Sequence, residues 1–213
     1  MEINFKQNTV KRFLPGLVIL FLSAILLAGC SSKKLEPLAE NSVIMAFGDS
    51  LTAGFGVQPN KSYPAVLAQL TGLKVVNAGI TGETTAEGLQ RLPELLNQHQ
   101  PGLVVLFEGG NDLLQKIPES QIEENLRKMI VSIQQSGASV ILVSVPEKKL
   151  FAGSLTLYSN LADEFSIPLE EDIIPNLLMR PSMKSDYVHF NAQGYGELAK
   201  AVYKVMQESG AVE

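Results

Sequence analysis

A serine near the start of this chain follows an apolar run and stands among turn residues. Residues 43–47 are apolar, Gly48 and Asp49 come next, and Ser50 is followed by a glycine-rich stretch. Glycine, aspartate and serine are ordinary turn residues, so a plain turn would explain the stretch. A serine held at a strand end could also act as a nucleophile, but its hydroxyl is weak at neutral pH and needs an adjacent base. The rest of the chain must supply that base.

The chain has two histidines that could serve as the base. His99 lies before Pro101 near the end of a predicted helix, where a solvated or capping role is typical. His189 follows Asp186 by three residues, so one local turn could set the carboxylate against the imidazole. There the carboxylate would fix the imidazole tautomer and stabilise the imidazolium form. The same two residues could instead form a cap before the last helix, and their spacing alone leaves both interpretations open.

Attack on an acyl carbonyl also requires hydrogen-bond donors for the developing oxyanion. The loss of one such donor typically costs roughly 100- to 1000-fold in rate. Candidate donors are the backbone N–H of Ser50, a glycine N–H in the stretch 77–85 and the side-chain amide of Asn111. Tight turns would explain the glycines equally well, and Asn111 with Asp112 could cap the segment that follows.

Short apolar runs alternate with helical patterns from residue 43 onward. The runs are typical of strands buried on both faces, and they cover residues 43–47, 74–76, 103–107, 140–145 and, more weakly, 167–169. Apolar residues at helical spacing cover 63–70, 85–97, 121–135 and about 192–207. Ser120 and Glu123 have the spacing of a capping box at the start of the third of these helices.

This alternation predicts a single three-layer α/β domain with a central, mostly parallel five-stranded sheet. In such sheets, ligands bind outside the carboxyl ends of the strands. The candidate nucleophile and oxyanion donors follow predicted strands, and the candidate base precedes the last helix. We therefore expect them to meet at one rim of the sheet.

The composition excludes several other classes of protein. The chain has 213 residues, of which 46% are hydrophobic and 18% charged, so it can form a full core. The formal net charge is -5 and no basic patch stands out, which argues against a nucleic-acid partner. The single cysteine, Cys30, excludes an intramolecular disulfide and a cysteine-based zinc site.

The first 29 residues differ from the rest of the chain. Three basic residues precede an uncharged, largely apolar run over residues 13–29, which is the layout of a secretory signal. An uncleaved N-terminal anchor is the alternative interpretation. The run ends in Leu-Leu-Ala-Gly followed by Cys30, and this ending resembles the bacterial lipoprotein signal.

The lipoprotein resemblance implies a signal peptide over residues 1–29, a lipidated tether over 30–42 and a folded domain over 43–213. Cys30 would carry a diacylglyceryl group and usually an N-acyl chain, which together anchor a protein stably where a single chain would not. We therefore expect an exported bacterial lipoprotein on the periplasmic face of a membrane. Ser31 after the cysteine favours the outer membrane.

Four stretches of the chain carry a second resemblance. They are FGDSLTAGFG, NAGITGETT, GGND and DYVH, which occur in the order and spacing of the four blocks of the GDSL, or SGNH, hydrolase family. The intervening chain resembles the bacterial arylesterase, thioesterase and lysophospholipase branch. The resemblance extends over about residues 43–207 and implies the flavodoxin-like fold of SGNH hydrolases.

By position, the resemblance implies Ser50 as nucleophile, His189 as general base and Asp186 as the acid that orients His189. It also implies an oxyanion hole made by the Ser50 backbone N–H, Gly82 and Asn111. Gly79 would then be a turn residue, and Asp49 would hold the nucleophile loop by accepting backbone N–H bonds.

The implied activity is a serine esterase that needs no metal or organic cofactor. Its substrates would be acyl or aryl esters, lysophospholipids or acyl thioesters, and we expect a monomer. An exported enzyme meets few acyl-CoA molecules, so esters and lysolipids rank above thioesters. Residues 146–160 replace the usual substrate-covering loop, and four of them could line an acyl groove or pack as ordinary core: Leu150, Phe151, Leu155 and Leu157.

Two other functions stay open at this point. One is an O-acetylesterase acting on cell-wall or polysaccharide acetyl groups, which would have a pocket too short for an acyl chain. The other is a non-catalytic binding lipoprotein whose glycine-rich first loop holds an anion. In a phosphate-binding P-loop a lysine follows the glycines, but none does here, which argues against the binding lipoprotein.

Overall fold

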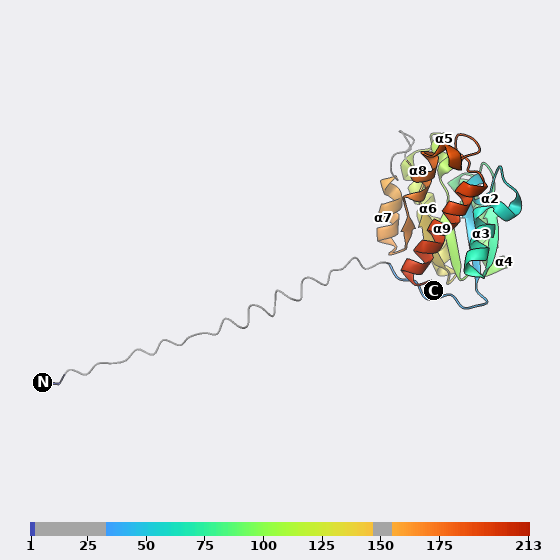
Figure 1. Cartoon of the computed structure of the whole chain (residues 1–213). Coiled ribbons are helices and arrows are strands. Elements are labelled where there is room, and N and C mark those ends of the chain that lie inside the picture. Colours follow the sequence, from blue (N-terminus) through green and yellow to red (C-terminus); the bar gives the residue numbers. More distant parts are fainter. Residues whose placement is uncertain (3–32, 147–154) are drawn as a thin grey trace. The chain divides into compact units, whose positions relative to one another are not determined.

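The computed structural model describes residues 1–2, 33–146 and 155–213, and the described residues from Lys33 onward belong to one compact unit. Its centre is a sheet of parallel strands in the order β2-β1-β3-β4-β5 (Figure 1). The strands are β1 (Val43–Gly48), β2 (Lys74–Gly79), β3 (Leu103–Phe107), β4 (Ser139–Val143) and β5 (Leu169–Glu170). The predicted α/β fold with a five-stranded parallel sheet is confirmed.

Helices cover both faces of this sheet. On one face α3 packs against α9, and on the other α6 packs between α4 and α7. The helices are α2 (Ser50–Ala53), α3 (Tyr63–Thr71), α4 (Thr85–His99), α5 (Gly110–Leu114), α6 (Glu119–Gln135), α7 (Thr156–Glu164), α8 (Ile173–Leu178) and α9 (Ala192–Ser209), with 3-10 turns at Pro59–Lys61 and Pro181–Met183. In the part of the chain that is described, no helix has both the length and the apolar character to cross a membrane.

The strands differ in burial because of their places in the sheet. Every residue of β3 is buried, and β1 and β4 are buried except at their first residue. The predicted burial of both faces is wrong for β2, which is only partly buried along its length. β2 forms an edge of the sheet and pairs with β1 alone, so it lacks a second neighbour.

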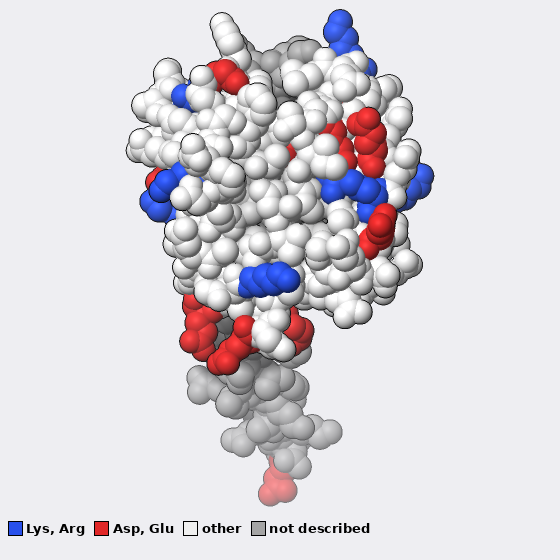
Figure 2. All heavy atoms as spheres, turned by 90° about the vertical axis from the view of Figure 1, so that its right-hand side faces the viewer, with Lys and Arg blue, Asp and Glu red and all other residues white. Residues whose placement is uncertain are grey.

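Most side chains on the face seen in Figure 2 are uncharged, and the lysines and arginines on this face do not merge into one continuous patch.

The predicted capping box at Ser120 is also wrong. α6 begins at Glu119 directly after Pro118, so Ser120 lies inside the first turn and no side chain caps the helix. Proline fixes its own backbone and lacks an N–H, which suits it to a helix start. A capping box occurs instead at α4, where the Thr84 N–H donates to Glu87 Oε2 at 2.8 Å. This box fixes the start of α4 beside the loop that follows β2.

The segment before β1 lies along the domain. The N–H of Leu35 donates to the carbonyl of Ser209 and that of Leu38 to the carbonyl of Ala211, both at 2.9 Å. The two leucine side chains pack against the core, so the ordered contacts of the domain begin before Val43. Cys30 and nearly all of the predicted signal peptide lie outside the described residues.

Candidate active site

The turn after β1 presents Ser50 at the carboxyl rim of the sheet. β1 ends at Gly48, Asp49 caps the short helix α2, and Ser50 is its first residue. Asp49 Oδ1 accepts a hydrogen bond from the Leu51 N–H at 2.9 Å, as predicted for an acid that holds this loop. A Cβ atom on residue 48 would lie 2.1 Å from the Phe107 carbonyl oxygen, so only glycine fits there. The serine is therefore fixed at a turn that β3 packs against closely.

The structure brings Ser50, His189 and Asp186 together, although 139 positions separate the serine from the histidine. His189 Nε2 lies 3.0 Å from Ser50 Oγ, and His189 Nδ1 lies 2.8 Å from Asp186 Oδ2. The Phe55 ring packs against the imidazole with a centroid separation of 4.4 Å. This is the order of contacts that a nucleophile, a base and an orienting acid require.

The local turn predicted for Asp186 and His189 is present. Asp186 Oδ1 accepts hydrogen bonds from the backbone N–H groups of His189 at 2.8 Å and Val188 at 2.9 Å. The His189 N–H is the largest cause that lowers the pKa of the Asp186 carboxyl, to about 2. Asp186 is therefore a carboxylate at neutral pH and holds the imidazole by accepting from Nδ1. The helix cap is supplied separately by Asn191, whose side chain accepts from Gln193 and Gly194 N–H groups.

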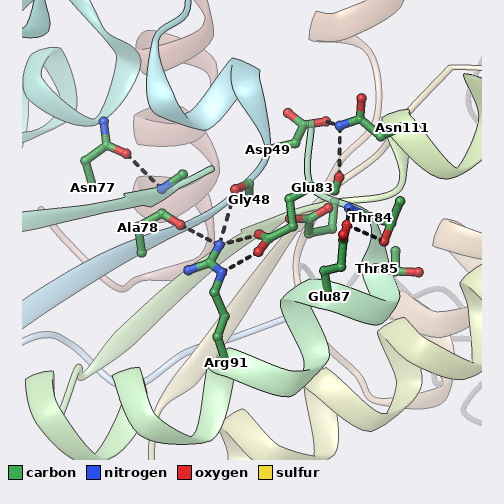
Figure 3. Close-up of polar contacts among 12 residues, drawn as sticks. Gly48, Asp49, Asn77, Ala78, Glu83, Thr84, Thr85, Glu87, Arg91 and Asn111 are labelled. Atoms are coloured by element: carbon green, nitrogen blue, oxygen red, sulfur yellow. Dashed lines mark hydrogen bonds and ion pairs between the residues drawn. The ribbon is translucent and has the colours of Figure 1, made fainter. Parts of the chain in front are cut away.

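Asn111 lies between the nucleophile turn and the loop after β2. Its Nδ2 donates to the Glu83 carbonyl oxygen at 2.9 Å and approaches Asp49 Oδ2 at 3.3 Å (Figure 3). Gly82, directly before Glu83, has φ of +86°, a left-handed conformation that disfavours residues with a side chain. Gly79 is the last residue of β2, and a Cβ atom there would lie 2.1 Å from the Ala53 nitrogen. Close packing against α2 therefore explains Gly79, and a special backbone conformation explains Gly82.

Asp49 is buried beside this cluster, with 5% of its surface exposed. Burial raises the pKa of the Asp49 carboxyl to about 6, against the opposing effects of the Leu51 N–H and the neighbouring His189. Asp49 thus carries a charge at neutral pH only at a cost to folding. No group of three or more histidine, cysteine, aspartate or glutamate side chains among the described residues could hold a metal ion.

A cavity of about 150 Å³ opens beside Ser50 and His189. Its walls are mainly apolar and come from α2, β3, α5, the segment that follows β4, α8 and the turn before His189. The apolar lining residues are Leu51, Phe107, Leu113, Leu114, Val145, Pro146, Ile174, Leu178 and Val188. Such a cavity next to a nucleophile suits an apolar acyl or aryl group.

Sequence reasoning missed α8, which supplies one wall of the cavity. Ile173, Ile174, Leu177 and Leu178 have helical spacing, but six residues are too few for this spacing to predict a helix. Leu155 and Leu157, considered as possible groove residues, are buried in the core and do not line the cavity. Leu150 and Phe151 lie outside the described residues. His99 is the last residue of α4, which runs back toward the amino-terminal ends of the strands. Ser50 lies at their carboxyl ends, so His99 is away from it.

Comparisons with known proteins agree with this arrangement. The model of the GDSL-like Lipase/Acylhydrolase family matches residues 46–196 of the chain. The chain belongs to this family. It is 32% identical over 177 residues to thioesterase 1/protease 1/lysophospholipase L1 of Escherichia coli K12, with 79% of this chain and 85% of that protein covered. It is 35% identical over 157 residues to an arylesterase of Vibrio mimicus, with 68% and 78% covered.

Among solved structures, the crystal structure of TesA matches with a TM-score of 0.69 at 27% identity, covering 78% of this chain and 98% of that one. This match agrees with the GDSL fold. This GDSL-like acylhydrolase is therefore an ester hydrolase.

Proposed function

We propose that this hydrolase cleaves esters through Ser50, His189 and Asp186. Ser50 Oγ attacks the acyl carbonyl carbon while His189 Nε2 takes its proton. The tetrahedral intermediate expels the alcohol, which leaves with that proton, and an acyl-serine remains. Water then attacks the acyl-serine, His189 again takes and returns a proton, and the carboxylic acid departs. The separation of 3.0 Å between His189 Nε2 and Ser50 Oγ is the observation that carries this proposal.

The oxyanion of the intermediate would receive hydrogen bonds from the backbone N–H groups of Ser50 and Gly82 and from Asn111 Nδ2. Without substrate, both Nδ2 hydrogens have acceptors, the Glu83 carbonyl at 2.9 Å and Asp49 Oδ2 at 3.3 Å. The longer contact is the weaker one. We expect the oxyanion to replace Asp49 as the acceptor while the bond to Glu83 keeps the amide in place.

Acyl or aryl esters and lysophospholipids are the substrates that we favour. The apolar cavity beside Ser50 supports an acyl or aryl group larger than acetyl. Thioesters rank lower because the N-terminal sequence resembles an export signal, and an exported enzyme meets few acyl-CoA molecules. The rival O-acetylesterase would gain nothing from an apolar cavity of this extent.

A series of p-nitrophenyl esters from acetate to palmitate tests this proposal. The full chain is expressed, including the predicted signal peptide over residues 1–29. We expect turnover to extend beyond butyrate. Ser50→Ala and His189→Ala should each lose at least roughly 1000-fold in kcat, because the nucleophile and its base act as a unit. A steep fall beyond acetate or butyrate would favour the O-acetylesterase, and full turnover by Ser50→Ala would refute the role of this serine.

We further propose that Cys30 carries the lipid anchor of an exported, membrane-bound protein, on the strength of the Leu-Leu-Ala-Gly-Cys sequence. Intact mass spectrometry of protein from bacterial membranes should give a chain that begins at Cys30 with attached acyl groups. Cys30→Ala should leave the chain unacylated and unprocessed at residue 29. An identical mass shift in both proteins would refute the anchor.

A further inference from the structure

A mostly buried ion pair involves the residue that follows Gly82, one of the proposed oxyanion donors. Arg91 extends from α4 to Glu83 in the loop after β2, and its Nε donates to Glu83 Oε1 at 2.5 Å (Figure 3). A terminal guanidinium nitrogen donates to Glu83 Oε2, which makes the contact bidentate. The side chains of Arg91 and Glu83 are only 20% and 4% exposed. An ion pair that is mostly removed from water holds its partners more firmly than one on the surface.

The same guanidinium also contacts the ends of the two strands that carry the site. It donates to the Ala78 carbonyl of β2 at 2.8 Å and approaches the Gly48 carbonyl of β1 at 3.5 Å. Its other side stacks on the Phe47 ring, with the guanidinium carbon 4.1 Å from the ring centroid. Gly48 precedes the nucleophile turn and Ala78 precedes the oxyanion loop. Arg91 therefore links both loops to one rigid helix.

Glu83 connects this ion pair to Asn111. While its carboxylate binds Arg91, its backbone carbonyl accepts the Asn111 Nδ2 hydrogen bond at 2.9 Å. Glu83 also follows Gly82, whose N–H is the other loop donor proposed for the oxyanion. A shift of Glu83 would thus displace both donors at once.

A second contact fixes the far side of the same loop. The Thr85 N–H donates to Asp112 Oδ2 at 2.8 Å, and Thr85 Oγ1 donates to Asp112 Oδ1 at 2.5 Å. Asp112 is the neighbour of Asn111 in α5 and is fully buried. The loop is therefore held at Thr85 whatever happens at Glu83, so loss of the ion pair should move the loop without unfolding it.

The buried carboxyl of Glu108 is a further acidic group near Glu83. Burial raises the pKa of the Glu108 carboxyl well above its ordinary range, and the charge of Asp49 and a hydrogen bond with Glu83 raise it further. Its Oε1 is buried and has no hydrogen-bond partner among the described residues.

We propose that Arg91 and Glu83 are positioning residues of the oxyanion hole, which they hold in place through the Glu83 carbonyl and the adjacent Gly82 N–H. This inference rests on the proposed function, because it requires Asn111 and Gly82 to act as the donors. Removing a whole donor typically costs roughly 100- to 1000-fold in kcat. Displacing the donors costs less, and we expect Arg91→Met to lower kcat about 10- to 100-fold with KM changed less than about 3-fold.

Arg127→Met is the matched control. Arg127 lies on α6, is 29% exposed on its side chain, and pairs with Glu123 and Glu164 away from the site. The Arg127→Met variant should be less stable than the wild type, but its kcat should stay within about 2-fold of the wild-type value. If Arg91 served only to hold α4 on the sheet, the two variants would behave alike once both are folded.

A double-mutant cycle with Asn111→Ala then tests the route of the effect. If Arg91 acts through the oxyanion hole, Arg91→Met should lower kcat by a clearly smaller factor in the Asn111→Ala background than in the wild type, because one of the two donors that Arg91 positions is already absent. Multiplicative effects, or an Arg91→Met kcat equal to that of Arg127→Met, would overturn the inference. An Asn111→Ala variant with wild-type kcat would instead refute the proposed oxyanion hole itself.

Arg91→Met leaves the buried Glu83 carboxylate without its partner, which should lower the free energy of unfolding. The double variant Arg91→Met/Glu83→Gln removes both charges and keeps the side-chain volumes close to the original. Its kcat should fall by the same 10- to 100-fold, and a wild-type kcat in this folded double variant would also overturn the inference.

Discussion

Replacing Asp49 by asparagine should change the pH dependence of stability in a defined way. Burial raises the pKa of this carboxyl from 3.8 to about 6, so the folded state binds its proton more tightly than the unfolded state does. The stability that this proton supplies is fully present below about pH 4 and is lost as the pH rises through 6. A difference of about two pKa units corresponds to about 3 kcal/mol. An asparagine side chain cannot ionise, so the variant escapes this loss.

The assay is urea unfolding of both proteins between pH 3.5 and 8. The unfolding free energy of Asp49→Asn, relative to the wild type, should rise by about 3 kcal/mol from the acid end to the alkaline end. Comparing the two proteins cancels the titration of groups that they share, apart from the groups whose charges interact with Asp49, among them His189, Glu83, Asp112 and Glu108. A relative stability that is constant with pH, or that falls as the pH rises, would refute the reasoning. The variant should also lose kcat, because an amide at residue 49 faces the Asn111 amide with a donor instead of an acceptor.

Three further substitutions test other parts of the account. Asp186→Asn places an amide against His189 Nδ1, where the wild-type carboxylate lies at 2.8 Å. The substitution should lower kcat with p-nitrophenyl butyrate by roughly 1000- to 10,000-fold. A loss under tenfold would contradict the proposal that Asp186 orients His189. Leu178→Trp should fill the cavity beside Ser50 and lower the octanoate-to-acetate ratio of kcat/KM by about tenfold, whereas an unchanged ratio would place the acyl group elsewhere. Gly109→Ala should cost about 2–4 kcal/mol in urea unfolding, because the new Cβ would lie 2.4 Å from Tyr158 Oη at a φ of +110°. Its control, Gly137→Ala, has a φ of +87° but no atom within 4 Å and should cost only about 1–2 kcal/mol, so equal costs would contradict the steric argument.

Much of the fold follows from local patterns in the sequence. The runs at residues 43–47, 74–76 and 103–107 fall within β1, β2 and β3, because apolar residues between turn signals have few alternatives to a strand in a parallel sheet. The position of the Asp186 and His189 pair was also predictable, since their contact forms within one turn. That Ser50 lies beside them follows from the strand order, which brings the end of β1 to the rim where α9 begins.

Other features depend on contacts that no local pattern encodes. Arg91 and Glu83 are charged residues in and before a helix, and such residues usually face solvent. Here Glu83 is buried and the Arg91 side chain is only 20% exposed, because its guanidinium binds Glu83 and the Ala78 carbonyl at the end of β2. α8 was missed because its six residues are too few for a clear period. The exposure of β2 depends on its place at the sheet edge, which is decided by pairing and not by its own residues.

Reaction with a fluorophosphonate tests the central claim most directly, because this reagent labels a serine that a neighbouring base has activated. Intact and peptide mass spectra should place one adduct on Ser50 in the wild type and none on that peptide in Ser50→Ala. His189→Ala should label at least roughly 1000-fold more slowly, because its serine lacks the imidazole that lies 3.0 Å away in the wild type. Labelling of His189→Ala at the wild-type rate, or an adduct on another residue with Ser50 unmodified, would contradict the account.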